Sequence, residues 1–386
     1  MAMDRCAPDG EGKAVEATER LQRDTRIDVL RGLALLLIFV DHIPGNVLGL
    51  FTLRNFGFSD AAELFVLLSG FSSMIAYGRV FERAGGLAGL RRILFRCLRI
   101  YMFQIGMLLA MVAIVQVGIS WFGWHAGEIG PLMHGMSGFR RGLSLQAVPS
   151  NLNILPLYLV LMGAFPVFWL GLRRWPMRAL LVSCGVWVAA NEIPGFNLVN
   201  WLDGQGWYFN PFAWQFLFVI AMLLCSHYLA QGQRLAVPRL LWLACLLYVG
   251  FALFAAAPWA NWGLAWKPLA LDPDKTTLAP LRLLNVLALF VLLMNISGFA
   301  GVAGSRWLRP LDLCGRHSLE VFSLGTMLSL FGHLVFHTFG TSALLQIAVN
   351  GGGFAAMIAL AAVLEWRKRT GRSKLPPGGL MEAAGR

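Results

Sequence analysis

Long runs of apolar residues alternate with short polar segments along almost the whole chain. Most of the runs match the 17–25 residues that an α-helix needs to cross the hydrocarbon core of a bilayer. Such runs predict membrane-spanning helices, because only helices and closed barrels satisfy their backbone groups inside a membrane. Ten segments are predicted: 28–48, 60–78, 93–118, 154–172, 177–193, 211–229, 239–257, 279–297, 312–334 and 343–366.

The composition agrees with this pattern, since 57% of the 386 residues are hydrophobic and only 13% are charged. We therefore predict an all-α fold, a polytopic integral membrane helix bundle with about ten transmembrane helices. The longest segment between predicted helices, residues 119–153, is too short for a separate soluble domain. The predicted organisation is a flexible N-terminal tail at 1–26, a transmembrane domain at 27–366 and a flexible basic tail at 367–386.

The distribution of Lys and Arg predicts the orientation in the membrane. With the N-terminus inside, 22 of these residues fall in inner loops and tails, and only five fall in outer loops. Both termini are therefore predicted to be cytoplasmic, and the first helix is predicted to be a retained signal anchor. Topology explains most of the net charge of +12, so no nucleic-acid partner is required. The six cysteines match no zinc spacing, and no metal site is predicted.

The first predicted helix carries Arg31 and, eleven residues later, His42. At 100° per residue the two lie within about 20° of one face and roughly 16 Å apart along the axis. A cation and a titratable imidazole on one intramembrane face indicate a functional site. Two structural alternatives remain: Arg31 could snorkel to the headgroups with Asp28 as its partner, and His42 could be a packing or capping residue before Pro44.

Carboxylates near His42 are the next candidates. Asp41 is its neighbour in the sequence and a candidate catalytic residue, although its side chain points about 100° away. Glu63, one turn inside the second predicted helix, is expected to meet His42 because a short outer loop joins the two helices. A carboxylate behind a histidine fixes its tautomer, as a general base requires. Asp60 is a good helix cap and a candidate substrate-binding residue.

Arginines on the predicted cytoplasmic side form a second group. Arg92, Arg96 and Arg99 follow one another at helical spacing on the third predicted helix, and Arg316 lies near the same surface. The guanidinium fork suits phosphates, so these residues are candidates for binding a polyanionic co-substrate. A stripe that contacts lipid headgroups explains the three helix arginines equally well.

Aromatic and polar residues gather on the predicted outer side. The segment 200–210 mixes aromatic rings with amides and an acid, and Trp207 is the candidate for stacking on a sugar ring. An interfacial aromatic belt accounts for many of the outer tryptophans. Arg282 enters the eighth predicted helix from this side and is a candidate substrate-binding cation.

The spacing of Arg31 and His42 resembles the first-helix signature of membrane acyltransferases of the acyltransferase-3 type. The run Asp28-x-x-Arg31-Gly32-Leu33-Ala34 is similar to the broader transmembrane acyltransferase superfamily. More narrowly, the chain resembles the OpgC family, which succinylates osmoregulated periplasmic glucans, and the combination of segments is specific. These segments are Arg26–Gly32, Ser59–Val66, Phe209–Gln215, Pro280–Asn285 and Gly315–Phe322.

The resemblance implies an O-acyltransferase of the bacterial inner membrane that spans it several times. It would move an acyl group, with succinyl-CoA as the expected co-substrate, from cytoplasmic acyl-CoA to a hydroxyl of a periplasmic glucan. The resemblance carries over Arg31 and makes His42 the catalytic residue. The roles of Glu63, of the helix arginines and of Arg282, which would hold the free carboxylate of a succinyl group, are our own extension. Direct attack in a ternary complex is preferred, because no serine or cysteine is placed next to the base in the sequence.

No permanently bound cofactor is expected, and the expected partners are acyl-CoA, the glucan and membrane lipids; an oligomer is possible. The alternative function is a glycan or lipid transporter or flippase without chemistry, because intramembrane charges also mark transport paths. The chain shows no inverted repeat, which counts against a transporter. A non-catalytic subunit of a glucan-synthesis assembly is a third hypothesis. The acyl group, the glucan size and the modified hydroxyl stay open.

Overall fold

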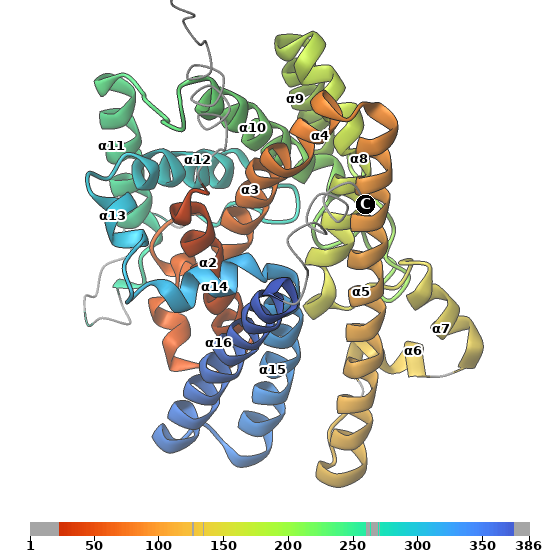
Figure 1. Cartoon of the computed structure of the whole chain (residues 1–386). Helices are drawn as coiled ribbons and strands as arrows, with labels where there is room; N and C mark the ends of the chain where they lie inside the picture. The colour runs from red at the N-terminus through yellow and green to blue at the C-terminus, as the bar shows by residue number, and fades with distance from the viewer. Residues whose placement is uncertain are drawn as a thin grey trace, which may run out of the picture.

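The computed structural model describes residues 23–373, except for residues 126, 134, 260–262, 264–268 and 270. This part of the chain is a bundle of α-helices (Figure 1), and it holds one isolated β-bridge and no strand. The predicted all-α class is therefore confirmed. Most of the two predicted tails, residues 1–22 and 374–386, lies outside the described residues.

Seven helical stretches within the described residues are long and apolar enough to cross a membrane, so the chain is a multi-pass membrane protein. The first is a continuous run of α3 (Ala61–Ser73), the π-helical turn η3 (Met74–Gly78) and α4 (Arg79–Arg83). The other six are α5 (Gly86–Phe122), α8 (Ile154–Arg174) with the preceding turn η5 (Ser150–Leu152), α10 (Pro211–Ala230), α11 (Arg239–Ala256), α15 (Ser318–Phe339) and α16 (Ala343–Ser373).

Three further predicted segments correspond to shorter helices: α2 (Thr25–Asp41), α9 (Pro176–Glu192) and α12 (Pro280–Met294). They contain 17, 17 and 15 residues. At 1.5 Å per residue these helices reach only about 23–26 Å, less than the roughly 30 Å of a typical hydrocarbon core. The total of ten spans and the cytoplasmic location of both termini therefore stay predictions.

The predicted segment 312–334 is not one helix. It divides at His317 into α14 (Arg309–Arg316) and α15, which continues to Phe339. The break follows from the close packing of α14 against α2. A Cβ atom on Gly315 would lie 1.8 Å from the carbonyl oxygen of Asp28, and one on Gly32 would lie 2.0 Å from that of Leu311. The two glycines thus let the backbones touch, which a straight α14–α15 helix would not reproduce.

The first predicted segment, 28–48, is helical only as far as Asp41. Gly45 has a φ of +76°, and the short turns η1 (Val47–Phe51) and η2 (Leu53–Asn55) follow it. Conversely, α16 continues through its three glycines and past Trp366 into the predicted tail. The remaining short elements are η4 (Gly127–Ile129), α6 (Gly130–Met133), α7 (Gly135–Leu143) and α13 (Phe299–Ala303).

α3 lies at the centre of the bundle, where α2, α10 and α12 pack against it (Figure 1). All of its residues except Ser72 are buried, as expected for a helix that is apolar on every side. Its first turn and the end of α2 therefore form part of one rigid core, and these two helix ends support the site described next.

Candidate active site

A cavity of about 340 Å³ lies where several helices begin or end, and we call it the His42 cavity. α2 ends there, and α3 and α8 begin there. The loops that precede α10 and α12 contribute aromatic and cationic side chains. The residues that line the cavity are Ile38, Asp41, His42, Arg54, Asp60, Ala61, Ala62, Ser150, Asn151, Asn153, Ile154, Tyr208, Phe209 and Lys275.

His42 directly follows the last residue of α2, and its ring is held by that helix. Nδ1 lies 2.7 Å from the carbonyl oxygen of Ile38, one turn back. Because a carbonyl oxygen only accepts hydrogen bonds, Nδ1 carries the proton of the neutral ring and Nε2 keeps its lone pair. This is the tautomer that a general base in the cavity requires.

Asp41 stabilises the wall of the cavity beside His42. Its carboxylate accepts a hydrogen bond of 2.6 Å from the Thr52 hydroxyl and lies 3.4 Å from Nε of Arg54. These contacts connect the end of α2 to the turn η2. The carboxylate is thus held by this turn, and Asp41 and His42 both line the cavity.

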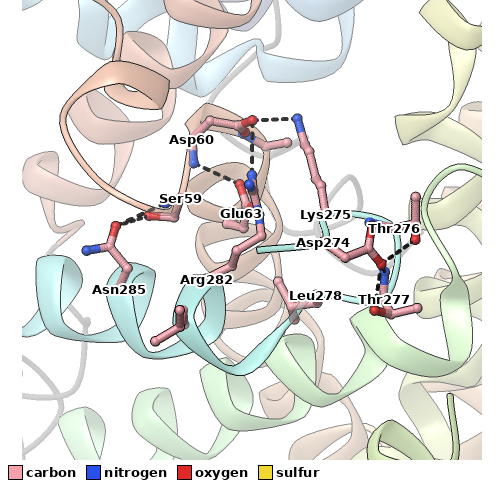
Figure 2. Close-up of polar contacts among 12 residues, drawn as sticks. Ser59, Asp60, Glu63, Asp274, Lys275, Thr276, Thr277, Leu278, Arg282 and Asn285 are labelled. Carbon is pink, nitrogen blue, oxygen red and sulfur yellow. Dashed lines mark hydrogen bonds and ion pairs between the residues drawn. The ribbon is translucent and has the colours of Figure 1, made fainter. Parts of the chain in front are cut away.

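Four charged side chains form a buried cluster at the start of α3 (Figure 2). Glu63 is fully buried and accepts hydrogen bonds from the backbone N–H of Asp60, at 3.0 Å, and from Nε of Arg282, at 2.6 Å. Asp60 caps the helix by accepting from the N–H of Ala62, and its other oxygen lies 2.5 Å from Nζ of Lys275 and 3.4 Å from Arg282. The cluster thus brings two buried acidic side chains together with two basic ones.

The cluster contradicts the predicted pairing of Glu63 with His42. Both oxygens of Glu63 are engaged by Asp60 and Arg282, and a backbone carbonyl orients the histidine instead. Arg282 spans the two carboxylates, is only 12% exposed and does not line the His42 cavity. Lys275 of the same cluster does line it.

Asp60 and Lys275 hold their charges through each other. Burial would raise the pKa of Asp60, but the positive charges of Lys275 and Arg282 outweigh this effect and lower it. Burial would lower the pKa of Lys275, but the negative charges of Asp60 and Glu63 raise it. The ion pair is therefore formed across the whole physiological pH range.

The aromatic wall of the cavity is formed by the two residues that follow Trp207, the residue predicted to stack on a sugar. Trp207 itself is buried and does not line the cavity. Tyr208 and Phe209 do, and Nζ of Lys275 lies 6.0 Å and 5.6 Å from the centres of their rings. Flat rings beside charged and amide groups, among them Asn151, can stack on a sugar and bind its hydroxyls.

A second, smaller cavity of about 120 Å³ contains Arg31, and we call it the Arg31 cavity. Arg96 of α5, Tyr158 of α8 and the first turns of α15 contribute to its wall, together with serines of α3. Nε of Arg96 is buried and has no hydrogen-bond partner. A buried donor of this kind usually has an acceptor that is missing from the protein alone.

Arg31 is directed into the bundle. Its guanidinium donates to the backbone oxygens of Gly315 and Leu68, each at 3.3 Å, and to the hydroxyl of Ser72. Asp28 lies 3.5 Å away. The side chain thus connects α2 to α3 and α14 and is only 12% exposed. Snorkelling towards lipid headgroups, the alternative that the sequence left open, does not describe this arrangement.

The other predicted arginines do not gather around Arg31. Only Arg96 lines the same cavity. Arg92 is exposed, and Arg99 pairs with Glu320 on the surface. Arg316 pairs with Asp312 and lines a separate surface hollow of about 350 Å³. Arg92, Arg96 and Arg99 of α5 therefore do not form one binding surface, because each has different surroundings.

The two cavities follow one another along the same three helices. On α3 the lining residues pass from Ala62 in the His42 cavity to Phe65 and Ser69 in the Arg31 cavity, at intervals of one turn. On α8 they pass from Ile154 to Tyr158 in the same way. Phe65 also stacks on Phe322 of α15, with 5.9 Å between the ring centres. An aromatic pair thus lies where the two cavities adjoin.

The turn after His42 is fixed by a buried amide pair. Nδ2 of Asn46 donates to Oδ1 of Asn350 on α16 at 2.8 Å, and Nδ2 of Asn350 donates back to Oδ1 of Asn46 at 3.0 Å. Gln346, one turn earlier on α16, donates to the carbonyl oxygen of Gly45 at 2.8 Å. Reciprocal hydrogen bonds between buried groups specify one geometry, so α16 fixes the backbone beyond the imidazole.

Sequence similarity to known proteins identifies the family of this chain. A family model described as OpgC protein matches residues 23–369, which is nearly all of the described chain. The chain belongs to the OpgC family. None of the curated proteins matches it.

Membership of the OpgC family supports a role in the modification of periplasmic glucans by a transferase-type activity. The site geometry is compatible with such a role, because the His42 cavity contains a histidine, aromatic rings and hydrogen-bonding groups. Within the described residues no cluster of three or more His, Cys, Asp or Glu side chains could hold a metal ion.

Sequence reasoning missed several residues of the His42 cavity in this OpgC-family protein. Ser150 and Asn151 lie in the turn η5 and Lys275 in a loop, and the helix pattern positions neither segment. Tyr208 lies beside the tryptophan that was chosen instead. The one available signal was their place directly before a predicted helix start, since α8, α10 and α12 all begin near this cavity.

Proposed function

We propose that the protein is a membrane O-acyltransferase that moves a succinyl group from cytoplasmic acyl-CoA to hydroxyl groups of a periplasmic glucan. The observation that carries this proposal is the free Nε2 lone pair of His42 in a cavity adjoining a second, arginine-lined cavity. One cavity thus offers a base for an acceptor hydroxyl. The other offers cations for a phosphorylated donor that arrives from the opposite side.

The donor side supports acyl-CoA by its charge and its size. Arg31 and Arg96 line the smaller cavity, Nε of Arg96 has no hydrogen-bond partner, and arginine donors suit phosphate oxygens. At about 120 Å³ this cavity is well below the roughly 300–1,000 Å³ of pockets that enclose drug-sized ligands. It therefore receives only the narrow part of the donor, with the pyrophosphate at Arg31 and Arg96 and the thioester-bearing arm extending towards His42. The adenosine stays at the surface near arginines such as Arg92 and Arg316.

The acceptor side supports a sugar. The larger cavity, at about 340 Å³, is near the lower end of that range and fits a sugar unit of the glucan rather than the whole polymer. Tyr208 presents a ring on which a sugar can stack, and Asn151 offers an amide for its hydroxyls. The charges of Asp60 and Lys275 cancel each other, so the acceptor meets a neutral wall.

In the proposed reaction Nε2 of His42 takes the proton of the acceptor hydroxyl while its oxygen attacks the thioester carbonyl carbon. The tetrahedral intermediate then collapses, the carbon–sulfur bond breaks, and the imidazolium returns the proton to the thiolate. The products are a glucan ester and free CoA. The carbonyl of Ile38 holds the ring throughout, because Nδ1–H donates to it in the neutral and in the charged state.

One residue of the cavity could support a two-step mechanism instead of direct attack by the acceptor hydroxyl. Ser150 lines it together with His42, so an acyl-enzyme on that hydroxyl is chemically conceivable. The direct route requires only the base, and we therefore expect Ser150→Ala to retain acyl transfer. A covalently labelled wild-type enzyme, together with an inactive Ser150→Ala variant, would replace the ternary complex by a two-step mechanism.

The test compares purified wild type with His42→Ala, using labelled succinyl-CoA and glucan. Removing a general base typically costs 10²–10⁴-fold in rate, so we expect label transfer to fall by at least about a hundredfold. His227→Ala is the control, because His227 is exposed near the end of α10 and does not line the cavity. Unchanged transfer by His42→Ala would contradict the proposed base, and glucan transport without acylation would support a transporter instead.

A further inference from the structure

A third cavity, of about 600 Å³, lies between α8, α9 and α10 and has no part in the proposed reaction. Its wall is almost entirely aliphatic and aromatic. Several of its residues are also strongly exposed on the outside of the bundle, Val167 by 72% and Val182 by 68%. In a multi-pass membrane protein a cavity with such a rim opens to the lipid hydrocarbon rather than to water.

The shape of this cavity fits a hydrocarbon chain. Along α8 its lining extends from Val160 to Gly171, which is about 16–17 Å at 1.5 Å per residue. That length exceeds one half of the roughly 30 Å hydrocarbon core, so the cavity can enclose one acyl chain lengthwise.

The interior offers such a chain no free polar group. Ser183 and Gln215 are the polar side chains inside, and they satisfy each other. The Ser183 hydroxyl donates to Oε1 of Gln215 at 2.6 Å, and Nε2 of Gln215 donates to the Ser183 carbonyl oxygen at 2.8 Å. The occupant is therefore recognised inside the cavity by its apolar surface alone.

One end of the cavity is cationic. Arg178, in the first turn of α9, lines it there, and Arg173 and Arg174 are the last two residues of α8. None of the three has a carboxylate partner among the described residues; Arg173 and Arg174 instead lie over the rings of Trp169 and Trp175. Unpaired arginines at the mouth of an apolar intramembrane pocket complement a phosphate.

We propose that this cavity binds one anionic glycerophospholipid, with an acyl chain between α8, α9 and α10 and its phosphate at Arg178. The first turn of α9, which has no side-chain cap, adds backbone N–H groups at the level of the phosphate. The site is separate from both cavities of the proposed reaction and does not depend on it. It gives the edge formed by α9 a lipid partner that stabilises the fold.

The experiment uses the full chain purified in mild detergent. Native mass spectrometry counts retained phospholipid per chain, before and after delipidation and addition of phosphatidylglycerol or phosphatidylcholine. Ala164→Trp fills the cavity, and Leu170→Trp is the matched control, because Leu170 is exposed on the same helix and does not line it. Arg178→Gln removes the phosphate contact, and Arg239→Gln, at the start of α11, is its control.

We expect wild type and both controls to retain about one phosphatidylglycerol per chain and to prefer it to phosphatidylcholine. Arg178→Gln should weaken the binding of phosphatidylglycerol about tenfold, as expected for one charge-assisted hydrogen bond to its phosphate, and Ala164→Trp should abolish retention. Loss of all lipid from wild type on washing would overturn the proposal. Equal retention by Ala164→Trp, or the absence of a preference between the two lipids, would do the same. If Ala164→Trp does not fold, its thermal unfolding will show this. The result for Arg178→Gln then tests the proposal.

Discussion

Replacing Arg282 with methionine should destabilise the protein and leave its choice of acyl donor unchanged. The guanidinium spans two buried carboxylates, with Nε 2.6 Å from Glu63 and Nη2 3.4 Å from Asp60. The substitution leaves Glu63 with only the backbone N–H of Asp60, whereas Asp60 keeps Lys275. Glu63 is thus left without its cation in the fully buried first turn of α3.

The size of the destabilisation follows from the loss of one of the two cations in the cluster. Breaking a buried ion pair by removing one partner costs about 3–5 kcal/mol. Because Asp60 retains a cation, we expect about 3 kcal/mol, which is a factor of more than a hundred in the folding equilibrium. Removing both partners in Arg282→Met/Glu63→Leu should recover most of this loss, since no buried charge is then left alone.

The assay is thermal unfolding in detergent, followed by tryptophan fluorescence, with donor preference measured on the same preparations using succinyl-CoA and acetyl-CoA. Arg239→Met is the control, because this exposed arginine at the start of α11 has no carboxylate partner among the described residues. A variant Arg282→Met that unfolds like wild type but no longer distinguishes the two donors would refute the structural role. It would restore the sequence-based prediction that Arg282 binds a succinyl carboxylate.

Three further outcomes are expected. Gly315→Ala should lower the unfolding temperature by several degrees in the same assay, because its Cβ would lie 1.8 Å from a backbone oxygen of α2. The stability difference between wild type and Asp60→Asn should shrink as pH falls below 3.8, since the folded pKa of Asp60 is lowered, and again as pH rises above 10.5, since that of Lys275 is raised. Asn350→Leu should reduce acyl transfer at least about tenfold, measured as kcat, more than it raises KM, because Asn46 loses the partner that fixes the turn after the base.

The helix pattern predicted where almost every long helix lies, because lipid-facing and core-facing helices are both apolar and their length is fixed by the membrane. It could not predict the break at His317. That break depends on contact between Gly315 and the backbone of α2, almost three hundred residues earlier in the chain. The apolar run continues through the break, so hydropathy alone contains no signal for it.

The candidate site could be predicted only where its residues belong to one helix, because the helical repeat then fixes their relative positions. Arg31 and His42 belong to the same helix, so their common face follows from the helical repeat. The partners of Glu63 and Asp60 could not be derived in this way, because Arg282 and Lys275 reach them from a distant helix and a distant loop. A short connecting loop made His42 the nearest candidate in the sequence, but in the fold Arg282 pairs with Glu63.

The central claim is that a donor on one side of the membrane reacts with an acceptor on the other through the adjoining cavities of Arg31 and His42. Proteoliposomes test it most directly, with labelled succinyl-CoA and glucan placed either in opposite compartments or together in one. Because no molecule in any orientation would reach both substrates from one side, we predict labelled glucan only when the compartments are opposite. Equal labelling with both substrates on the same side of sealed vesicles would contradict the account.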